Sequence, residues 1–169
     1  EMCIRDSASG GGRSSVRETV SRVAAGAVAR RVLEKFAPTL SLVAYVESIK
    51  DVKVPSLSHE SLTRERVQES LVRCPCPETT QKMMALVRRV RDEGDSVGGV
   101  IRCVISNPPL GLGEPVFDKL DADLAKAMLS IQAVKGFEIG TGFEATRMLG
   151  SEHNDPFVKK GGRIGTRSN

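Results

Sequence analysis

The chain has 169 residues, of which 40% are hydrophobic and 27% are charged, a composition that is ordinary for one folded domain with a sizeable core. The net charge of +4 and the pI of about 9.0 mildly favour an anionic partner, but the scattered basic residues do not indicate a nucleic-acid-binding protein. No apolar run is long enough to span a membrane, and no charged-then-apolar leader opens the sequence, so we expect neither a membrane protein nor a secreted one.

The first marked feature is a glycine-rich stretch, SGGGRSSVRETV, that runs into a helical pattern over residues 15–36. Ser15 is a good N-cap, and Glu18 three residues later completes the pattern of a capping box. The glycines at 10–12 allow a ligand to approach the backbone closely, and Arg13 adds a forked cationic donor. Because free N–H groups and the helix dipole favour an anion, the stretch predicts a phosphate or another anionic ligand. An ordinary capped turn is the alternative, and the absent P-loop lysine argues against an NTPase.

The rest of the chain alternates between strand and helix patterns. We predict strands over 39–46, 97–106 and 133–140, helices over 61–72, 78–92 and 118–130, a loop over 47–60 and a turn-rich tail after Gly150. The helix at 78–92 is expected to turn four side chains inward, those of Met83, Leu86, Val87 and Val90. Gly26, among small residues in the first helix, predicts close packing of a neighbouring element.

The cysteines and histidines give little sign of a metal or catalytic site. Cys74 and Cys76 form C-x-C, not the C-x-x-C of most zinc sites, and no second pair completes it, so we expect no metal and a reducing compartment. Cys103 lies in an apolar run and is expected to be buried. His153, within GSEHNDP, is expected in a turn, with acid–base or metal chemistry as the alternative.

Several segments together resemble the chorismate synthase family. They are GGGRSSVRETVSRVAAGAVARRVLEKF, RCPCPE, EGDSVGGVI, GLGEPVFDKLDADLAKAMLSIQAVKGFEIG and GSEHND, which occur in family order from about Ala8. The resemblance implies an α+β fold, with layers of helices and antiparallel sheet, and a homotetramer. It also implies a lyase of the shikimate pathway, cytoplasmic or, in a plant or alga, plastidic.

The resemblance further implies the reaction and its ligands. The family eliminates phosphate from 5-enolpyruvylshikimate 3-phosphate in an anti-1,4 sense and requires reduced FMN, with NADPH as a further ligand where the enzyme reduces its own flavin. Arg13, Ser14 and Ser15 match the family's R-S-S flavin-binding element, and Gln132 and Ala133 match its second flavin-contacting dipeptide. Arg13 is also expected to meet the anionic substrate. No membrane or nucleic-acid partner is implied.

The departures from the family pattern limit what this chain is expected to do. The family's essential histidines, in F-G-E-S-H-G and R-P-G-H segments, are absent, as are its downstream K-P-T-S-S and H-D-P flavin elements. No catalytic residue is therefore assigned here, and His153 is not one of the family's histidines. We expect residues 8–169 to be the central part of a single chorismate synthase domain and residues 1–7 to be a non-native terminus. The chain alone is expected to be inactive.

Two other functions remain open at this stage. One is a non-enzymatic module that binds an anion or nucleic acid through the glycine-rich, basic helix start, although only 4% of the residues are aromatic. The other is a pseudoenzyme that serves only in assembly. The reading frame on either side of this segment distinguishes them, because it would contain the two histidine segments only in an enzyme.

Overall fold

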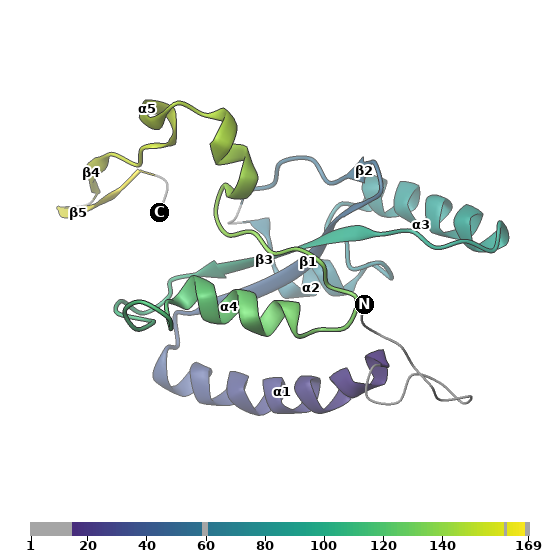
Figure 1. Ribbon diagram of the computed structural model, residues 1–169, viewed down its shortest axis with the longest axis horizontal. Coiled ribbons are helices and arrows are strands. Elements are labelled where there is room, and N and C mark those ends of the chain that lie inside the picture. Colours follow the sequence, from purple (N-terminus) through teal and green to yellow (C-terminus); the bar gives the residue numbers. More distant parts are fainter. Residues whose placement is uncertain (1–14, 59–60, 161, 168–169) are drawn as a thin grey trace. The chain divides into compact units, whose positions relative to one another are not determined.

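The computed structural model describes residues 15–58, 61–160 and 162–167, and it divides the chain into two compact units (Figure 1). One unit consists of residues 24–110, and the other combines residues 1–23 with residues 111–169. The α+β fold class is confirmed, since helices occur together with antiparallel strands.

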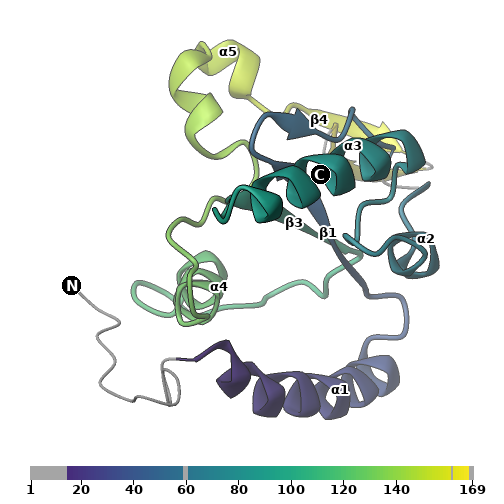
Figure 2. The ribbon, with the colours of Figure 1, turned by 90° about the vertical axis from the view of Figure 1, so that its right-hand side faces the viewer.

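The unit of residues 24–110 is built around a three-stranded antiparallel sheet in the order β2-β1-β3. Its elements are β1 (Ser41–Ile49), β2 (Val52–Lys53), α2 (Arg64–Gln68), α3 (Pro77–Asp92) and β3 (Gly99–Ser106). The long pairing of β1 with β3 runs from Ser41 opposite Ser106 to Ile49 opposite Gly99, with an irregularity between Val46 and Ser48. Figure 2 shows α3 in front of β1 and β3, with α2 beside it.

Two small clusters of buried side chains form the core of this unit. The first joins Val43 and Tyr45 of β1 to Val67 of α2. The second joins Val54, Cys74 and Met83. Because alternate residues of a strand face opposite sides, Val43 and Tyr45 mark one face of the sheet as the covered face.

The other face of the same sheet is apolar and exposed. Leu42 pairs with Ile105, and Ala44 pairs with Cys103, on the side of the sheet away from the buried tyrosine. Cys103 is exposed there, so its predicted burial is wrong. Ile101 and Ile105 of β3 lie on this same face and are exposed as well.

The second unit consists of short elements with little burial. After the 3-10 helix η2 (Val16–Glu18) and the start of α1 (Thr19–Phe36) come α4 (Leu120–Leu129), η4 (Gly142–Arg147), α5 (Gly150–His153), β4 (Phe157–Lys160) and β5 (Arg163–Thr166). The strands β4 and β5 form an antiparallel hairpin. None of the residues that the structure describes in this unit is buried as a whole.

Most predicted elements are present, with boundaries that differ by a few residues. The helices predicted at 15–36, 78–92 and 118–130 correspond to η2 with α1, to α3 and to α4. The strand predicted at 133–140 is wrong, because the chain turns at Ala133 and continues without strand pairing. The predicted loop over 47–60 contains the end of β1 and all of β2, and the hairpin in the tail was missed.

The inward and packing side chains were predicted only in part. Met83 is fully buried and Leu86 nearly so, as expected for α3, whereas Val87 is 37% exposed. The close packing predicted at Gly26 is wrong, because a Cβ built there would meet nothing within 4 Å and α1 has no buried residue.

Candidate functional site

The start of the long helix is fixed by Ser15. This residue has an extended backbone, and its hydroxyl accepts hydrogen bonds from the Arg17 backbone N at 3.3 Å and from Arg17 Nε at 3.2 Å. The predicted N-cap is therefore confirmed. The predicted capping box with Glu18 is wrong, because the Ser15 hydroxyl accepts from Arg17 and the Glu18 N–H donates to the Ser15 carbonyl at 3.0 Å in a 3-10 first turn. Arg13, Ser14 and the glycines at 10–12 lie outside the described residues.

The second predicted segment is a tight turn at the end of α4. Ser130 follows the helix and donates its N–H to the Lys126 carbonyl at 3.1 Å. The Val134 N–H donates to the Ile131 carbonyl at 3.2 Å, which places Gln132 and Ala133 at the two central positions of the turn. The side-chain oxygen of Gln132 is buried.

Ala133 holds an unfavourable backbone conformation in this turn. Its φ is +69°, in the left-handed region that costs a residue with a Cβ about 1–2 kcal/mol. A type II turn requires such an angle at its third position and normally places glycine or asparagine there. Strained backbone persists only where the surroundings enforce it, and it often occurs at ligand sites.

A side-chain hydrogen bond joins the two segments. Arg22 Nη1, on α1, donates to Ser130 Oγ at 2.6 Å, although the two residues are 108 positions apart. The Ser130 hydroxyl in turn donates to the Ala127 carbonyl at 2.6 Å. The beginning of α1 and the end of α4 belong to the same unit, and Figure 1 shows them close together. The structure thus brings the helix that begins at Ser15 next to the chain that leads into Gln132.

Sequence reasoning did not identify Arg22 or Ser130. Each is an ordinary polar residue at a helical position, and a spacing of 108 residues carries no local signal. Both lie inside segments that carried the family resemblance, RETVSRV and SIQAVKG, and that is the only sign of them in the sequence.

The other titratable candidates do not form a site. His153 ends the short helix α5 and is exposed. In the described ranges, no group of three or more histidine, cysteine or acidic side chains could hold a metal ion. Cys76 is the N-cap of α3, and hydrogen bonds from the side chain and backbone of Thr79 lower the pKa of its thiol. Cys74 is buried.

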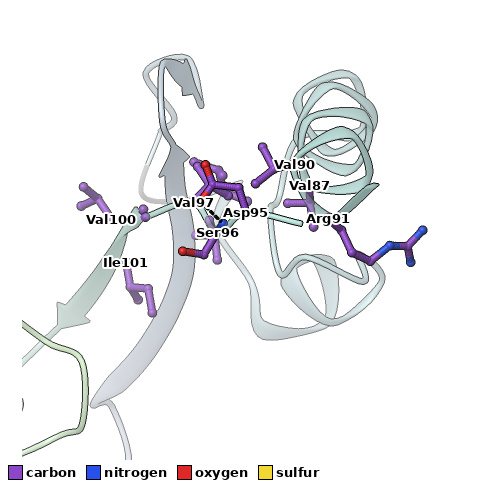
Figure 3. Close-up of a pocket in the computed structure, with 12 residues that line it drawn as sticks. Val87, Val90, Arg91, Asp95, Ser96, Val97, Val100 and Ile101 are labelled. Atoms are coloured by element: carbon purple, nitrogen blue, oxygen red, sulfur yellow. Dashed lines mark hydrogen bonds between the residues drawn. The ribbon is translucent and has the colours of Figure 1, made fainter. Parts of the chain in front are cut away.

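A cavity of about 430 Å³ lies in the other unit, between the end of α3 and the sheet (Figure 3). Its lining is mostly apolar, and Figure 3 shows the Arg91 side chain pointing away from it. The lining residues are Val46, Ile49, Val87, Val90, Arg91, Asp95, Ser96, Val97, Gly98, Gly99, Val100 and Ile101. It contains none of the predicted site residues.

Comparison with known proteins identifies one family. The family model described as chorismate synthase matches residues 2–169. The chain is 52% identical over 166 residues to chloroplastic chorismate synthase of Arabidopsis thaliana, covering 96% of this chain and 38% of that protein. It is 54% identical over 160 residues to chorismate synthase of Opitutus terrae, covering 95% of this chain and 44% of that protein.

A crystal structure of chorismate synthase has a similar fold. The similarity has a TM-score of 0.82 at 36% sequence identity and covers 91% of this chain and 49% of that chain. The chain thus spans about two fifths of the length of these two curated relatives.

Proposed function

The chain belongs to the chorismate synthase family, and we propose that it is the central part of a longer lyase that converts 5-enolpyruvylshikimate 3-phosphate to chorismate and phosphate. The observation that carries this proposal is the family match over residues 2–169, which agrees with a TM-score of 0.82 to a solved chorismate synthase. A nucleic-acid-binding module, the alternative, finds no support in these comparisons.

The proposed reaction is a 1,4-elimination with no net redox change. The C–O bond to phosphate breaks, a C–H bond at the far end of the conjugated system breaks, and a proton and phosphate leave as a new double bond forms. Reduced FMN, when bound, supplies electron density as the phosphate departs. NADPH is a further ligand only if the whole protein reduces its own flavin.

The residues present here fit the binding of such a cofactor. Ser15 offers a hydroxyl at a helix start, where N–H groups and the helix dipole favour an anion. Gln132 lies in the turn after α4 beside Ala133, whose left-handed backbone is a strained conformation of a kind that occurs at ligand sites. We assign Arg13, Ser14 and Ser15 to one part of the flavin site, and Gln132 and Ala133 to another. Arg13 is additionally assigned to the anionic substrate.

The cellular location and the oligomeric state of the whole enzyme are part of the same proposal. The Arabidopsis relative is named as chloroplastic, which is consistent with a plastid or cytoplasmic enzyme of the shikimate pathway. We propose a homotetramer, as the resemblance implies. None of the helices in the described part of the chain combines the length and apolar character that a membrane span requires.

Extending the reading frame on both sides and expressing the whole protein tests this function. We expect anaerobic chorismate formation with reduced FMN, followed by absorbance, and we expect flanking sequence that contains the two histidine segments. The 169-residue chain, assayed in parallel, should be inactive, because general acid–base groups contribute about 10²–10⁴-fold each. Turnover by the chain within about tenfold of the whole protein would contradict the need for flanking histidines. Absence of turnover by the whole protein would refute the function.

A further inference from the structure

We propose that Arg22 and Ser130 are positioning residues that fix the helix start at Ser15 relative to the turn at Gln132 and Ala133. The inference rests on the proposed function and adds two residues that lie outside the assigned Arg13–Ser15 and Gln132–Ala133 segments. Its basis is the hydrogen bond from Arg22 Nη1 to Ser130 Oγ, at 2.6 Å. The donor is a charged guanidinium, and both side chains are exposed.

The hydroxyl of Ser130 is oriented from both sides. It accepts from Arg22 and donates to the Ala127 carbonyl, one turn earlier in the same helix, at 2.6 Å. The Ser130 backbone is held as well, because its N–H donates to the Lys126 carbonyl. A side chain held at donor and acceptor has one orientation available, so it can transmit the position of Arg22 to the end of α4.

The bond lies close to both assigned segments along the chain. Arg22 is seven residues after Ser15, about two helical turns along a continuous helical segment, so moving Arg22 moves the helix start with it. Ser130 is two residues before Gln132, and the intervening turn is fixed by the bond between Val134 and Ile131. The turn ends in the left-handed Ala133, a conformation that must be enforced by its surroundings.

Other arginines of the same helix make exposed pairs that stay within the helix. Arg30 Nε and Arg31 Nη1 both contact Glu34, at 3.3 Å and 3.1 Å, about one turn away along α1. Such pairs stabilise the helix locally and connect it to nothing else. Arg22 instead reaches a residue 108 positions away, and Arg31 therefore serves as its matched control.

The test uses the whole protein, with Arg22→Ala, Ser130→Ala, the double variant, Arg22→Lys and the control Arg31→Ala. FMN affinity is measured by flavin fluorescence in the presence of 5-enolpyruvylshikimate 3-phosphate, and the absorption spectrum of the bound flavin is recorded. Loss of one hydrogen bond to a charged group predicts FMN binding about tenfold weaker in each single alanine variant. The double variant should be no weaker than the single ones, because the two residues act as one unit.

The remaining variants separate positioning from a general structural role. Arg22→Lys keeps the charge and should recover binding to within about threefold, and Arg31→Ala should stay within about twofold, as for a surface pair. The bound-flavin spectrum should shift in the Arg22→Ala and Ser130→Ala variants and stay that of the wild type in Arg31→Ala. The thermal midpoint of the apoprotein is measured alongside.

Each outcome bears on a different claim. Wild-type affinity and spectrum in the alanine variants would overturn the positioning role and leave the proposed function intact. A lowered thermal midpoint with unchanged affinity and spectrum would show a structural bond only, and would also overturn it. A whole wild-type protein that binds no FMN would refute the proposed function and this inference with it.

Discussion

The two units of this chain differ most in what holds them together. Residues 24–110 contain every buried hydrophobic side chain found in the described residues, from Val43 of the sheet to Leu86 of α3. The described residues of the other unit contain none, and large apolar side chains such as Phe117 and Phe157 are more than 80% exposed there. The interactions that hold it include backbone hydrogen bonds in turns and the Arg22–Ser130 bond.

This difference separates the folding core from the candidate site. The described flavin residues Ser15, Gln132 and Ala133 belong to the unit without buried residues, whereas the apolar cavity lies in the packed unit. Regions with few buried apolar contacts open at low free energy, so the candidate site belongs to the less stable part of the chain. The following substitutions test this contrast.

The largest effect is expected from truncating a methionine in each unit. Met83 is fully buried, and Met83→Ala should lower the free energy of unfolding by about 3 kcal/mol, because it removes buried methylene groups and leaves a cavity. Met128 of α4 is 38% exposed, and Met128→Ala should cost less than about 1 kcal/mol, since alanine also favours the helix. Urea denaturation of both variants measures the two changes in the free energy of unfolding. Equal losses would show that the two units do not differ in how tightly they are packed.

The sequence predicted the packed unit better than the candidate site. The α3 pattern correctly placed Met83 and Leu86 inward because hydrophobic periodicity reports which side of a helix packs. The apolar run of β3 predicted burial for Cys103, but periodicity cannot say whether a partner covers the second face of the sheet. A strand likewise needs a neighbouring strand to pair with, and the sequence pattern does not show whether one is present. Residues 133–140 have a strand pattern but form no strand.

The site itself was predictable only through the family resemblance and one local rule. The N-cap rule identified Ser15, whose hydroxyl does cap the helix start. Gln132 and Ala133 came from the resemblance, and no propensity rule anticipates an alanine at φ +69°. The bond between Arg22 and Ser130 is a tertiary contact between two unremarkable positions, so it became visible only in the folded chain.

A second, smaller effect is expected where β3 meets β1. A Cβ on Gly99 would lie 2.5 Å from the Ser48 carbonyl oxygen, so the strands must separate to accept it. Gly99→Ala should therefore cost about 2 kcal/mol, typical of overpacking against atoms that cannot move freely. Its neighbour Gly98 has open space around a built Cβ, and Gly98→Ala should be neutral or stabilise by up to about 1 kcal/mol. Thermal denaturation compares the two, and equal midpoints would show that the sheet yields easily at this position.

The smallest effect is expected in the unit without a core, where relieving strain should stabilise the chain. Ala133→Gly removes the Cβ that makes its φ of +69° unfavourable, a relief of about 1–2 kcal/mol. Glycine also raises the entropy of the unfolded chain, which offsets about 0.5–1 kcal/mol, so we expect a net gain of at most about 1 kcal/mol. The control Ala125→Gly, inside α4, has no strain to relieve and should destabilise by about 1 kcal/mol. Urea denaturation measures the change in the free energy of unfolding for both variants. A gain for Ala133→Gly with a loss for Ala125→Gly would show that the Gln132–Ala133 turn is strained, whereas a loss for both would show that it is not.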